Sequence, residues 1–280
     1  MVVVDNLDPS YSLEQKRENL SRAQRKGDFQ FEERDLRTGV EDLLPVDRII
    51  HLATYFQKSS SPEEAFLCHD INVNASLLLY EAARKTKTPR VLLGSSSEVY
   101  GRHPKTPFPD DAGLLTPVSL TGATKLAAEN YLRVYSDLHG IEGTILRIFN
   151  PYGPGGGLIH QWAKSIMVEE EIDLPGKGEH EREYTFIDDL LSGIEGALDH
   201  SDPFTFYNIG GGAGASDKVV ISMLENGLGK KSQIRYRKQW KTEVEKVWGG
   251  TEKARINLGY EPRVSLEEGI RQVVSAQQSE

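Results

Sequence analysis

Residues 90–95 read Arg90-Val91-Leu92-Leu93-Gly94-Ser95, a short apolar run that ends in small and polar residues. Such a run predicts a strand buried on both faces of a parallel sheet. A helix is predicted from Gly122 to His139, where Gly140 stops it, and the next strand from Thr144 to Ile148. Because a strand, a helix and a second strand in this order form a crossover, the segment predicts a parallel α/β fold.

The same alternation extends toward the N-terminus. Strands are predicted at Met1–Leu7, Phe29–Asp35 and Arg48–Ala53, with a helix from Leu13 to about Gln24. A longer helix runs to Ala83 from Ser61, its predicted N-cap, with Pro62 in the first turn. Residues 1–150 are therefore expected to form one doubly wound, Rossmann-like domain.

After residues 150–157, NPYGPGGG, the predicted elements become shorter and less regular. Residues 151–280 are expected to form mainly a smaller C-terminal α/β substrate lobe, with some segments returning to the first domain. Its predicted elements are helices at 160–168, 188–198 and 266–275, a helix after Ser216 or Asp217, and strands at 172–174, 183–186 and 204–208.

Composition limits the classes of protein. The 280 residues suffice for one large core, or for one core and a smaller lobe. The net charge of −9 argues against nucleic acid or an anionic membrane as partner. The single cysteine, Cys68, excludes an internal disulfide, and the seven histidines show no metal-ligand spacing. No long apolar run and no secretory signal are present, so we expect a cytoplasmic protein.

Asp5, at the end of the first predicted strand, stands where a dinucleotide-binding fold places the acid that binds the adenosine ribose. In that fold a first strand and a glycine-rich turn precede the acid by about 20 residues, so both are predicted to be missing here. Residues 210–215, GGGAGA, match the glycine spacing but lack the later acid, and a flexible loop entering a helix is preferred. Residues 153–157 lack a P-loop lysine and are interpreted as a hinge or a loop of the lobe.

Several segments together resemble, in order, the extended short-chain dehydrogenase/reductase family of NAD-dependent sugar-nucleotide epimerases and dehydratases. They are residues 3–7, 35–36, 51–53, 72–74, 95–101, 122–125, 147–154, 182–189, 207–210 and 262–269. The resemblance covers essentially the whole chain. Residues 5–11 and 117–120 look most like UDP-glucuronate 4-epimerases, although the arginine that such enzymes carry after Tyr-Gly-Pro is absent from Gly155–Leu158.

The resemblance implies oxidation of a sugar hydroxyl by NAD, a keto intermediate, and return of the hydride to the other face. The family uses a tyrosine four residues before the lysine as base, and residues 117–125, PVSLTGATK, carry Thr121 at that position before Lys125. An aliphatic hydroxyl ionises far above the phenol pKa of about 10. We therefore expect catalysis to be impaired.

The resemblance also assigns residues to roles. The catalytic positions are Ser96, Thr121 and Lys125. The positions for NAD are Asp5, Asn6, Asp35, Leu36, Leu52, Ala53, Asn72 and Lys125. The positions for the nucleotide-sugar, most plausibly a UDP-sugar, are Ser96, Ser97, Glu98, Asn150 and Arg182. A homodimer joined through helices 61–83 and 122–139 is expected by analogy.

Three readings stay open beside an altered UDP-sugar (UDP-hexose or UDP-hexuronate) 4-epimerase. One is a non-catalytic sugar-nucleotide-binding or scaffold protein. Another is a dehydratase or decarboxylase relative, which Glu98 favours and Ser97, at the adjoining acid position, weakens. The third is an enzyme that uses Ser96, Glu98 and Lys125 without a dinucleotide.

Overall fold

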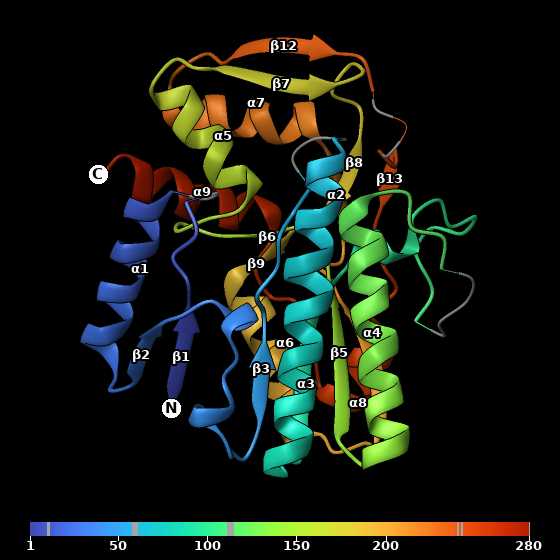
Figure 1. Ribbon diagram of the computed structural model, residues 1–280. Helices are drawn as coiled ribbons and strands as arrows, with labels where there is room; N and C mark the ends of the chain where they lie inside the picture. Colours follow the sequence, from blue (N-terminus) through green and yellow to red (C-terminus); the bar gives the residue numbers. More distant parts are fainter. Residues whose placement is uncertain (10–11, 58–60, 111–114, 240, 242, 280) are drawn as a thin grey trace.

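A computed structural model describes residues 1–9, 12–57, 61–110, 115–239, 241 and 243–279. Ser10 and Tyr11, part of the resemblance at residues 5–11, lie outside them. The centre is a four-stranded parallel sheet in the order β10-β5-β4-β3 (Figure 1). Its strands are β3 (Ile49–His51), β4 (Arg90–Ser96), β5 (Glu142–Ile148) and β10 (Phe204–Ile209). The predicted parallel α/β fold is confirmed.

Helices cover both faces of this sheet. On one face α3 (Ala75–Thr86) and α4 (Leu120–His139) pack against it, and Val91 and Leu93 of β4 point into that core. On the other face are α6 (Ile187–Asp199) and α8 (Glu252–Leu258), with Leu92 and Leu146 in the core between. All seven residues of β4 are buried, as the apolar run predicts.

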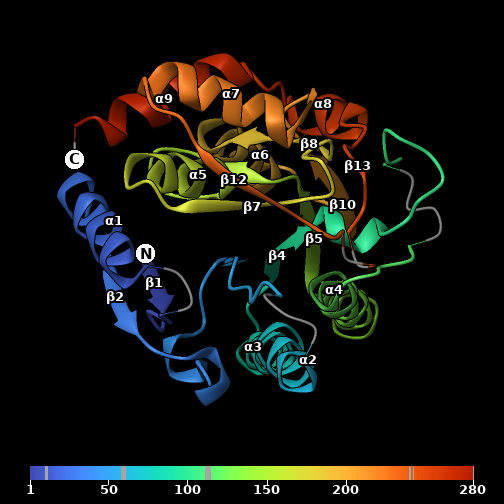
Figure 2. The ribbon, with the colours of Figure 1, turned by 90° about the horizontal axis from the view of Figure 1, so that it is seen from above.

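A second, two-stranded parallel sheet lies apart from the first. It consists of β1 (Val2–Asp5) and β2 (Gln30–Glu33), joined by α1 (Leu13–Lys26). No residue of α1 is buried, and the small core of Val40, Leu79 and Ala82 lies between α3 and the segment that follows β2. Two one-turn 3-10 helices, η1 (Leu36–Thr38) and η2 (Glu41–Leu43), connect β2 to β3. Figure 2 shows this N-terminal unit displaced to one side of the central sheet.

The long predicted helix is divided into three segments. Ser61 caps α2 (Pro62–His69) by accepting the Glu64 N–H, and a π-helical turn, η3 (Asp70–Asn74), joins α2 to α3. The π turn carries Asn72 into the interior, where the side chain is buried. A π turn within a helix often marks a functional site.

Helix α4 begins in close contact with η4 (Ser97–Tyr100), the 3-10 turn that follows β4. Ser119 is its N-cap and accepts the Gly122 N–H at 3.0 Å. A Cβ at Gly122 would lie 2.4 Å from the Glu98 carbonyl oxygen, so only glycine fits this approach. The helix ends at Gly140, whose φ of 70° is favourable for glycine.

The C-terminal part has its own core, which includes Ile159, Leu174, Phe186 and Leu224. It is built from β6 (Pro151–Tyr152), α5 (Leu158–Met167), β7 (Glu171–Pro175), β9 (Thr185–Phe186), α7 (Asp217–Leu228), β12 (Gln233–Arg237) and α9 (Leu266–Gln277). A small sheet contains β8 (Glu181–Glu183), β11 (Gly214–Ser216) and β13 (Lys246–Val247). The predicted strand at 183–186 is thus divided between β8 and β9.

The chain crosses between the two parts more than once. Strand β10 pairs with β5, and α6 and α8 pack on the central sheet, so segments beyond residue 151 return to it. Strands β11, β12 and β13 and helix α8 have no counterpart among the sequence-based predictions. The division at residue 150 stays a prediction. Within the described ranges, no helix has both the length and the apolar character needed to cross a membrane.

Candidate functional site

Several of the predicted site residues cluster where the strands of the central sheet end. Leu52 and Ala53 follow β3, Ser96 ends β4 and Asn150 follows β5. Thr121 and Lys125 lie in the first turns of α4, which packs against the end of β4. Ligands of open parallel sheets bind at the carboxyl ends of the strands.

Thr121 faces the protein interior. Its side chain is 1% exposed, and its Oγ1 accepts the backbone N–H of Gln57 at 2.8 Å. The Gln57 Oε1 in turn accepts the Leu120 N–H at 2.8 Å. This pair of hydrogen bonds fastens the loop after β3 to the start of α4. No sequence signal points to Gln57.

Lys125, one turn further along α4, is also 1% exposed. Its Nζ donates to the carbonyl oxygens of Gly94 at 2.8 Å and Ala53 at 3.4 Å. Burial lowers the pKa of this ammonium to about 7, although the negative charge of Glu129 opposes the shift. The lysine therefore ties the ends of β3 and β4 to α4.

A buried ion pair lies beside Lys125, and the sequence reasoning missed it. Arg147 and Glu129 meet at 2.8 Å, and each side chain is only 4% exposed. Ser95 donates to Glu129 at 2.5 Å, and the Arg147 guanidinium also lies over the ring of Tyr100. These contacts fix the end of β4 against α4 and β5.

Ser96, Ser97 and Glu98 form the turn after β4. Ser96 caps this turn by accepting the Glu98 N–H at 3.2 Å, and Ser97 is buried. The Glu98 carboxyl accepts a hydrogen bond from Ser119. Burial raises the pKa of Glu98, while the Ser119 hydrogen bond and the positive charge of Arg182 lower it. The N-cap position of Ser119, ahead of the predicted helix, was a usable signal that the sequence reasoning did not take.

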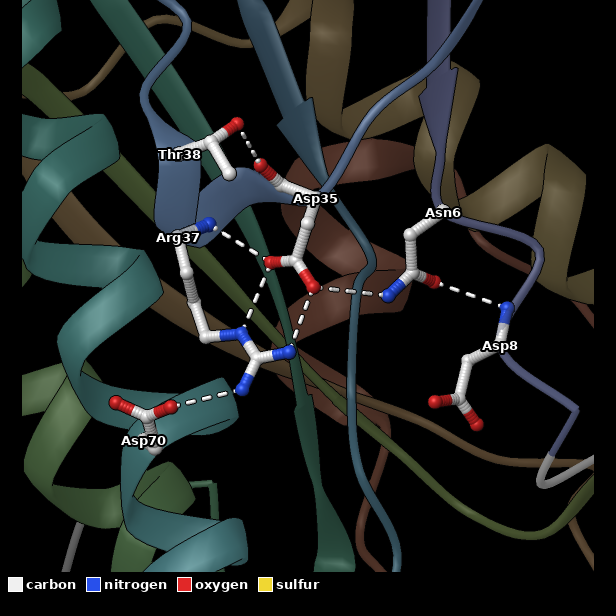
Figure 3. Close-up of polar contacts among 6 residues, drawn as sticks. All are labelled: Asn6, Asp8, Asp35, Arg37, Thr38 and Asp70. Carbon is white, nitrogen blue, oxygen red and sulfur yellow. Dashed lines mark hydrogen bonds and ion pairs between the residues drawn. The ribbon is translucent and has the colours of Figure 1, made fainter.

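The residues assigned to the adenosine end of NAD lie at the ends of β1 and β2. Asp5 accepts the Leu7 N–H at 2.6 Å and lies 3.4 Å from Lys16 Nζ. Asn6 donates to Asp35 at 3.1 Å, as Figure 3 shows. Leu36 is the first residue of η1, next to Asp35.

Asp35 is held mainly by its neighbour Arg37. The Arg37 guanidinium donates to Asp35 at 2.7 Å and 3.0 Å and to Asp70 of the π turn at 2.8 Å (Figure 3). These hydrogen bonds keep the pKa of Asp35 far below its ordinary value. The network joins the end of β2 to the π turn η3.

Asn72 holds the loop that follows β3. Asn72 accepts the Tyr55 N–H at 2.7 Å and donates to the Tyr55 carbonyl at 2.9 Å and to Thr124 at 3.0 Å. Leu52 is 49% exposed. Desolvation and the carboxylate of Glu64 raise the pKa of Tyr55, which makes this tyrosine a poor base at neutral pH.

The two residues assigned to the substrate diphosphate lie in the C-terminal part. Asn150 donates to the Glu183 carbonyl at 2.8 Å, and Arg182 donates to Asp217 at 3.1 Å. The Arg182 side chain is 23% exposed, and its charge acts on Glu98. Arg182 thus brings a cation from the C-terminal part toward the end of β4.

Glu183, next to Arg182 in the chain, is a buried acid. The sequence reasoning gave it no role in the site. Its carboxylate accepts the N–H groups of Gly212 at 2.7 Å and Gly249 at 2.8 Å. Burial raises its pKa to about 7, and the two N–H donors oppose the shift. A Cβ at Gly210 would lie 2.3 Å from the Glu183 Oε1, so glycine at this position leaves room for the carboxylate.

The residues fit the adenosine end of NAD but do not fit its pyrophosphate. Asp5, Asn6 and Asp35 offer acceptors for an adenosine. Within the described ranges, no glycine-rich turn opens a helix beside β1 or β3, as a pyrophosphate site requires. Residues 210–212 lead into β11 in the C-terminal part instead. We therefore derive no chemical step through the dinucleotide.

A parallel α/β sheet with acids, amides and a lysine at its strand ends defines a nucleotide-binding protein of the Rossmann type. A family model, described as the NAD dependent epimerase/dehydratase family, matches residues 2–210. The chain belongs to this family, whose cofactor is NAD. It is 30% identical to a UDP-glucuronate 4-epimerase of Thermodesulfobacterium geofontis over 282 residues, which cover 97% of this chain and 86% of that protein.

Solved structures agree with this membership. The crystal structure of UDP-glucuronic acid 4-epimerase from Bacillus cereus, with UDP-glucuronic acid and NAD, superimposes with a TM-score of 0.92 at 28% identity, covering 100% of this chain and 91% of that chain. A dTDP-glucose 4,6-dehydratase from Streptomyces venezuelae with NAD bound gives 0.89 at 26% identity, covering 99% and 87%. Relatives of both reaction types therefore share the fold.

Proposed function

We propose that this protein is a UDP-sugar-binding relative of the NAD-dependent 4-epimerases whose turnover is impaired. The observation that carries the proposal concerns Thr121, which the family resemblance assigns to the base position: its side chain is buried, and its hydroxyl accepts the Gln57 N–H. A general base must instead reach the proton that it removes and have a pKa near the working pH. The hydroxyl of Thr121 meets neither condition.

Substrate binding requires fewer groups than catalysis. Arg182 is partly exposed and can bind a diphosphate oxygen by a charge-assisted hydrogen bond, next to Asn150. The Bacillus cereus structure contains UDP-glucuronic acid, and the Thermodesulfobacterium relative is named as a UDP-glucuronate 4-epimerase. These residues support a nucleotide-sugar site between the strand ends and β8, with Ser96 and Glu98 toward the sugar.

The test is a calorimetric titration with UDP-glucuronate and UDP-glucose, followed by chromatography of the same samples for epimer. We expect binding without epimer formation. Arg182→Ala should weaken binding at least about tenfold, because a hydrogen bond from a charged group contributes about 1.5–3 kcal/mol. Arg235→Ala, an exposed arginine of β12, is the matched control and should bind normally. No binding of any UDP-sugar would refute the proposal.

A dehydratase-type activity is the second candidate, because burial raises the pKa of Glu98 at the end of β4. A raised pKa favours the protonated carboxyl group, which is the form that can donate a proton. Ser97, where dehydratases place an adjoining acid, counts against this candidate. Mass spectrometry of a dTDP-glucose incubation decides it, since dehydration removes one water from the sugar.

We also propose a homodimer through the outer face of α3 and α4. Tyr131, Val134 and Leu138 of α4 are apolar and exposed, their spacing of three and four residues places them on one face of the helix, and Leu138 is 71% exposed. Contiguous exposed apolar side chains mark protein interfaces. Light scattering should give twice the monomer mass, and Leu138→Glu should return the monomer; a monomeric native chain would refute this proposal.

A cytoplasmic location stays a prediction.

A further inference from the structure

Asp217, the first residue of α7, is a buried acid that the sequence-based assignments leave without a role. It is 1% exposed. Strand β11 ends just before it and pairs with β8, with Ala215 opposite Arg182. Oδ1 of Asp217 accepts Arg182 Nε at 3.1 Å and the Tyr184 hydroxyl at 3.0 Å. Because Tyr184 belongs to the C-terminal core, the folded chain itself fixes this carboxylate.

Arg182 meets this acid through a single nitrogen. The second carboxylate oxygen of Asp217, Oδ2, is buried and has no hydrogen-bond partner among the described residues. Arg147 and Arg235 behave differently, since each donates to both oxygens of its acid through Nε and a terminal nitrogen. Within the described ranges, the Nε bond to Asp217 is the one hydrogen bond of the Arg182 side chain, which leaves Nη1 and Nη2 for other acceptors.

The two terminal nitrogens of Arg182 can serve a ligand. The side chain is 23% exposed, and its positive charge lowers the pKa of Glu98 at the end of β4. The guanidinium is therefore within electrostatic range of the strand ends. Its terminal nitrogens present parallel N–H groups that match two oxygens of one phosphate. A side chain already held in place loses less freedom on binding, which strengthens the interaction.

We propose that Asp217 is a positioning residue of the nucleotide-sugar site: it holds Arg182 at Nε so that Nη1 and Nη2 bind a phosphate of the ligand. The inference rests on the function proposed above, in which Arg182 contacts the diphosphate. Asp217 does not touch the ligand itself, since its carboxylate is buried. Tyr184 supports the arrangement by donating to the same oxygen that Arg182 contacts.

Calorimetric titration of the full chain with UDP-glucuronate tests the proposal in four proteins: the unmodified chain, Arg182→Ala, Asp217→Asn and the double variant. Asp217→Asn keeps the size of the side chain and removes its charge. It should weaken binding by about two- to tenfold, the effect of freeing one long side chain. In the Arg182→Ala background the same change should have no further effect, because residues that act through one contact are not additive. Glu225→Gln, which removes another paired acid of α7, is the matched control and should bind normally.

The outcomes separate this inference from the proposed function. No binding of UDP-glucuronate or UDP-glucose by the unmodified chain would refute both. If the unmodified chain binds, unchanged or tighter binding in Asp217→Asn would overturn the role of Asp217 alone. An equal loss in the Arg182→Ala background would also overturn it, because Asp217 would then act on the fold and not through Arg182.

A second variant applies if Asp217→Asn does not fold, as judged by circular dichroism. Tyr184→Phe removes only the hydroxyl that donates to Asp217. It should weaken UDP-glucuronate binding by at least about twofold in the unmodified chain, because Asp217 and Arg182 are then held less firmly. The change should again disappear in the Arg182→Ala background. Unweakened binding in Tyr184→Phe, or a loss that persists without Arg182, would overturn the proposal.

Discussion

The central sheet and the N-terminal β1–α1–β2 unit use the same strand–helix–strand order but differ in what surrounds them. Strand β4 is buried along its whole length between two helical layers, while α1 contributes no buried residue. Ion pairs follow the same division: Arg147–Glu129 is 4% exposed on each side, and Arg22–Glu18 on α1 is over 40% exposed. Local sequence therefore forms the elements, whereas neighbours on both sides determine how firmly they are held.

The largest expected effect is at the buried ion pair. Arg147→Met should destabilise the fold by about 3–5 kcal/mol, because it leaves the Glu129 carboxylate buried without its cation. Arg22→Met on α1 removes an exposed pair and should change stability by less than about 0.5 kcal/mol. Chemical denaturation of the two variants measures the difference in the free energy of unfolding. Similar losses in both would contradict the claim that the two regions differ in how firmly they are held.

Core packing gives the next effect. Leu93→Ala in β4 should cost about 2–5 kcal/mol, because it opens a cavity between α3, α4 and the sheet. Val3→Ala in the half-buried strand β1 should cost clearly less. Thermal unfolding of both variants tests this order. A larger loss for Val3→Ala would show that β1 is packed as firmly as β4.

Glu183 is expected to contribute to the free energy of unfolding in a pH-dependent way. Because its folded pKa is raised to about 7, the folded state binds this proton more tightly than the unfolded state, whose pKa is near 4.5. The contribution is fully present below about pH 4.5 and is lost as the pH rises to about 7, at most about 3 kcal/mol. Glu183→Gln should flatten the stability curve in this window. A difference between the two proteins that does not vary with pH would contradict the assignment.

The smallest expected effect concerns the exposed pair of Lys16 and Asp5. Lys16→Met should change stability by less than about 0.5 kcal/mol, and the change should shrink further in high salt. Denaturation at two salt concentrations measures it, with Arg22→Met as the comparison in the same helix. A loss above about 1 kcal/mol would mean that the end of β1 is more firmly structured than its exposure indicates.

Sequence predicted the elements that local rules determine. The buried run at β4, the Ser61 cap and the stop at Gly140 were all readable. That Thr121 stands at the position of the catalytic tyrosine stays a prediction from the family pattern. These features depend on neighbours in sequence, or on a motif carried within a few residues.

Contacts between distant segments were not predictable. The bond from Gln57 to Thr121 joins residues 64 apart, and Glu183 binds Gly249, 66 residues away. Nothing in the local composition of residues 233–237 indicates that β12 will pair with β7. Likewise, the sequence gives no sign that Lys125 points to the Gly94 carbonyl, because that depends on how α4 packs on β4.

The most direct test of the account is prolonged incubation of the unmodified chain with UDP-glucuronate and NAD, in parallel with Thr121→Val. Chromatographic analysis of the sugar nucleotide is the measurement. The account predicts that UDP-glucuronate binds but that neither protein forms UDP-galacturonate. Epimer formation by the unmodified chain that Thr121→Val abolishes would contradict it, because the Thr121 hydroxyl would then be serving as the base.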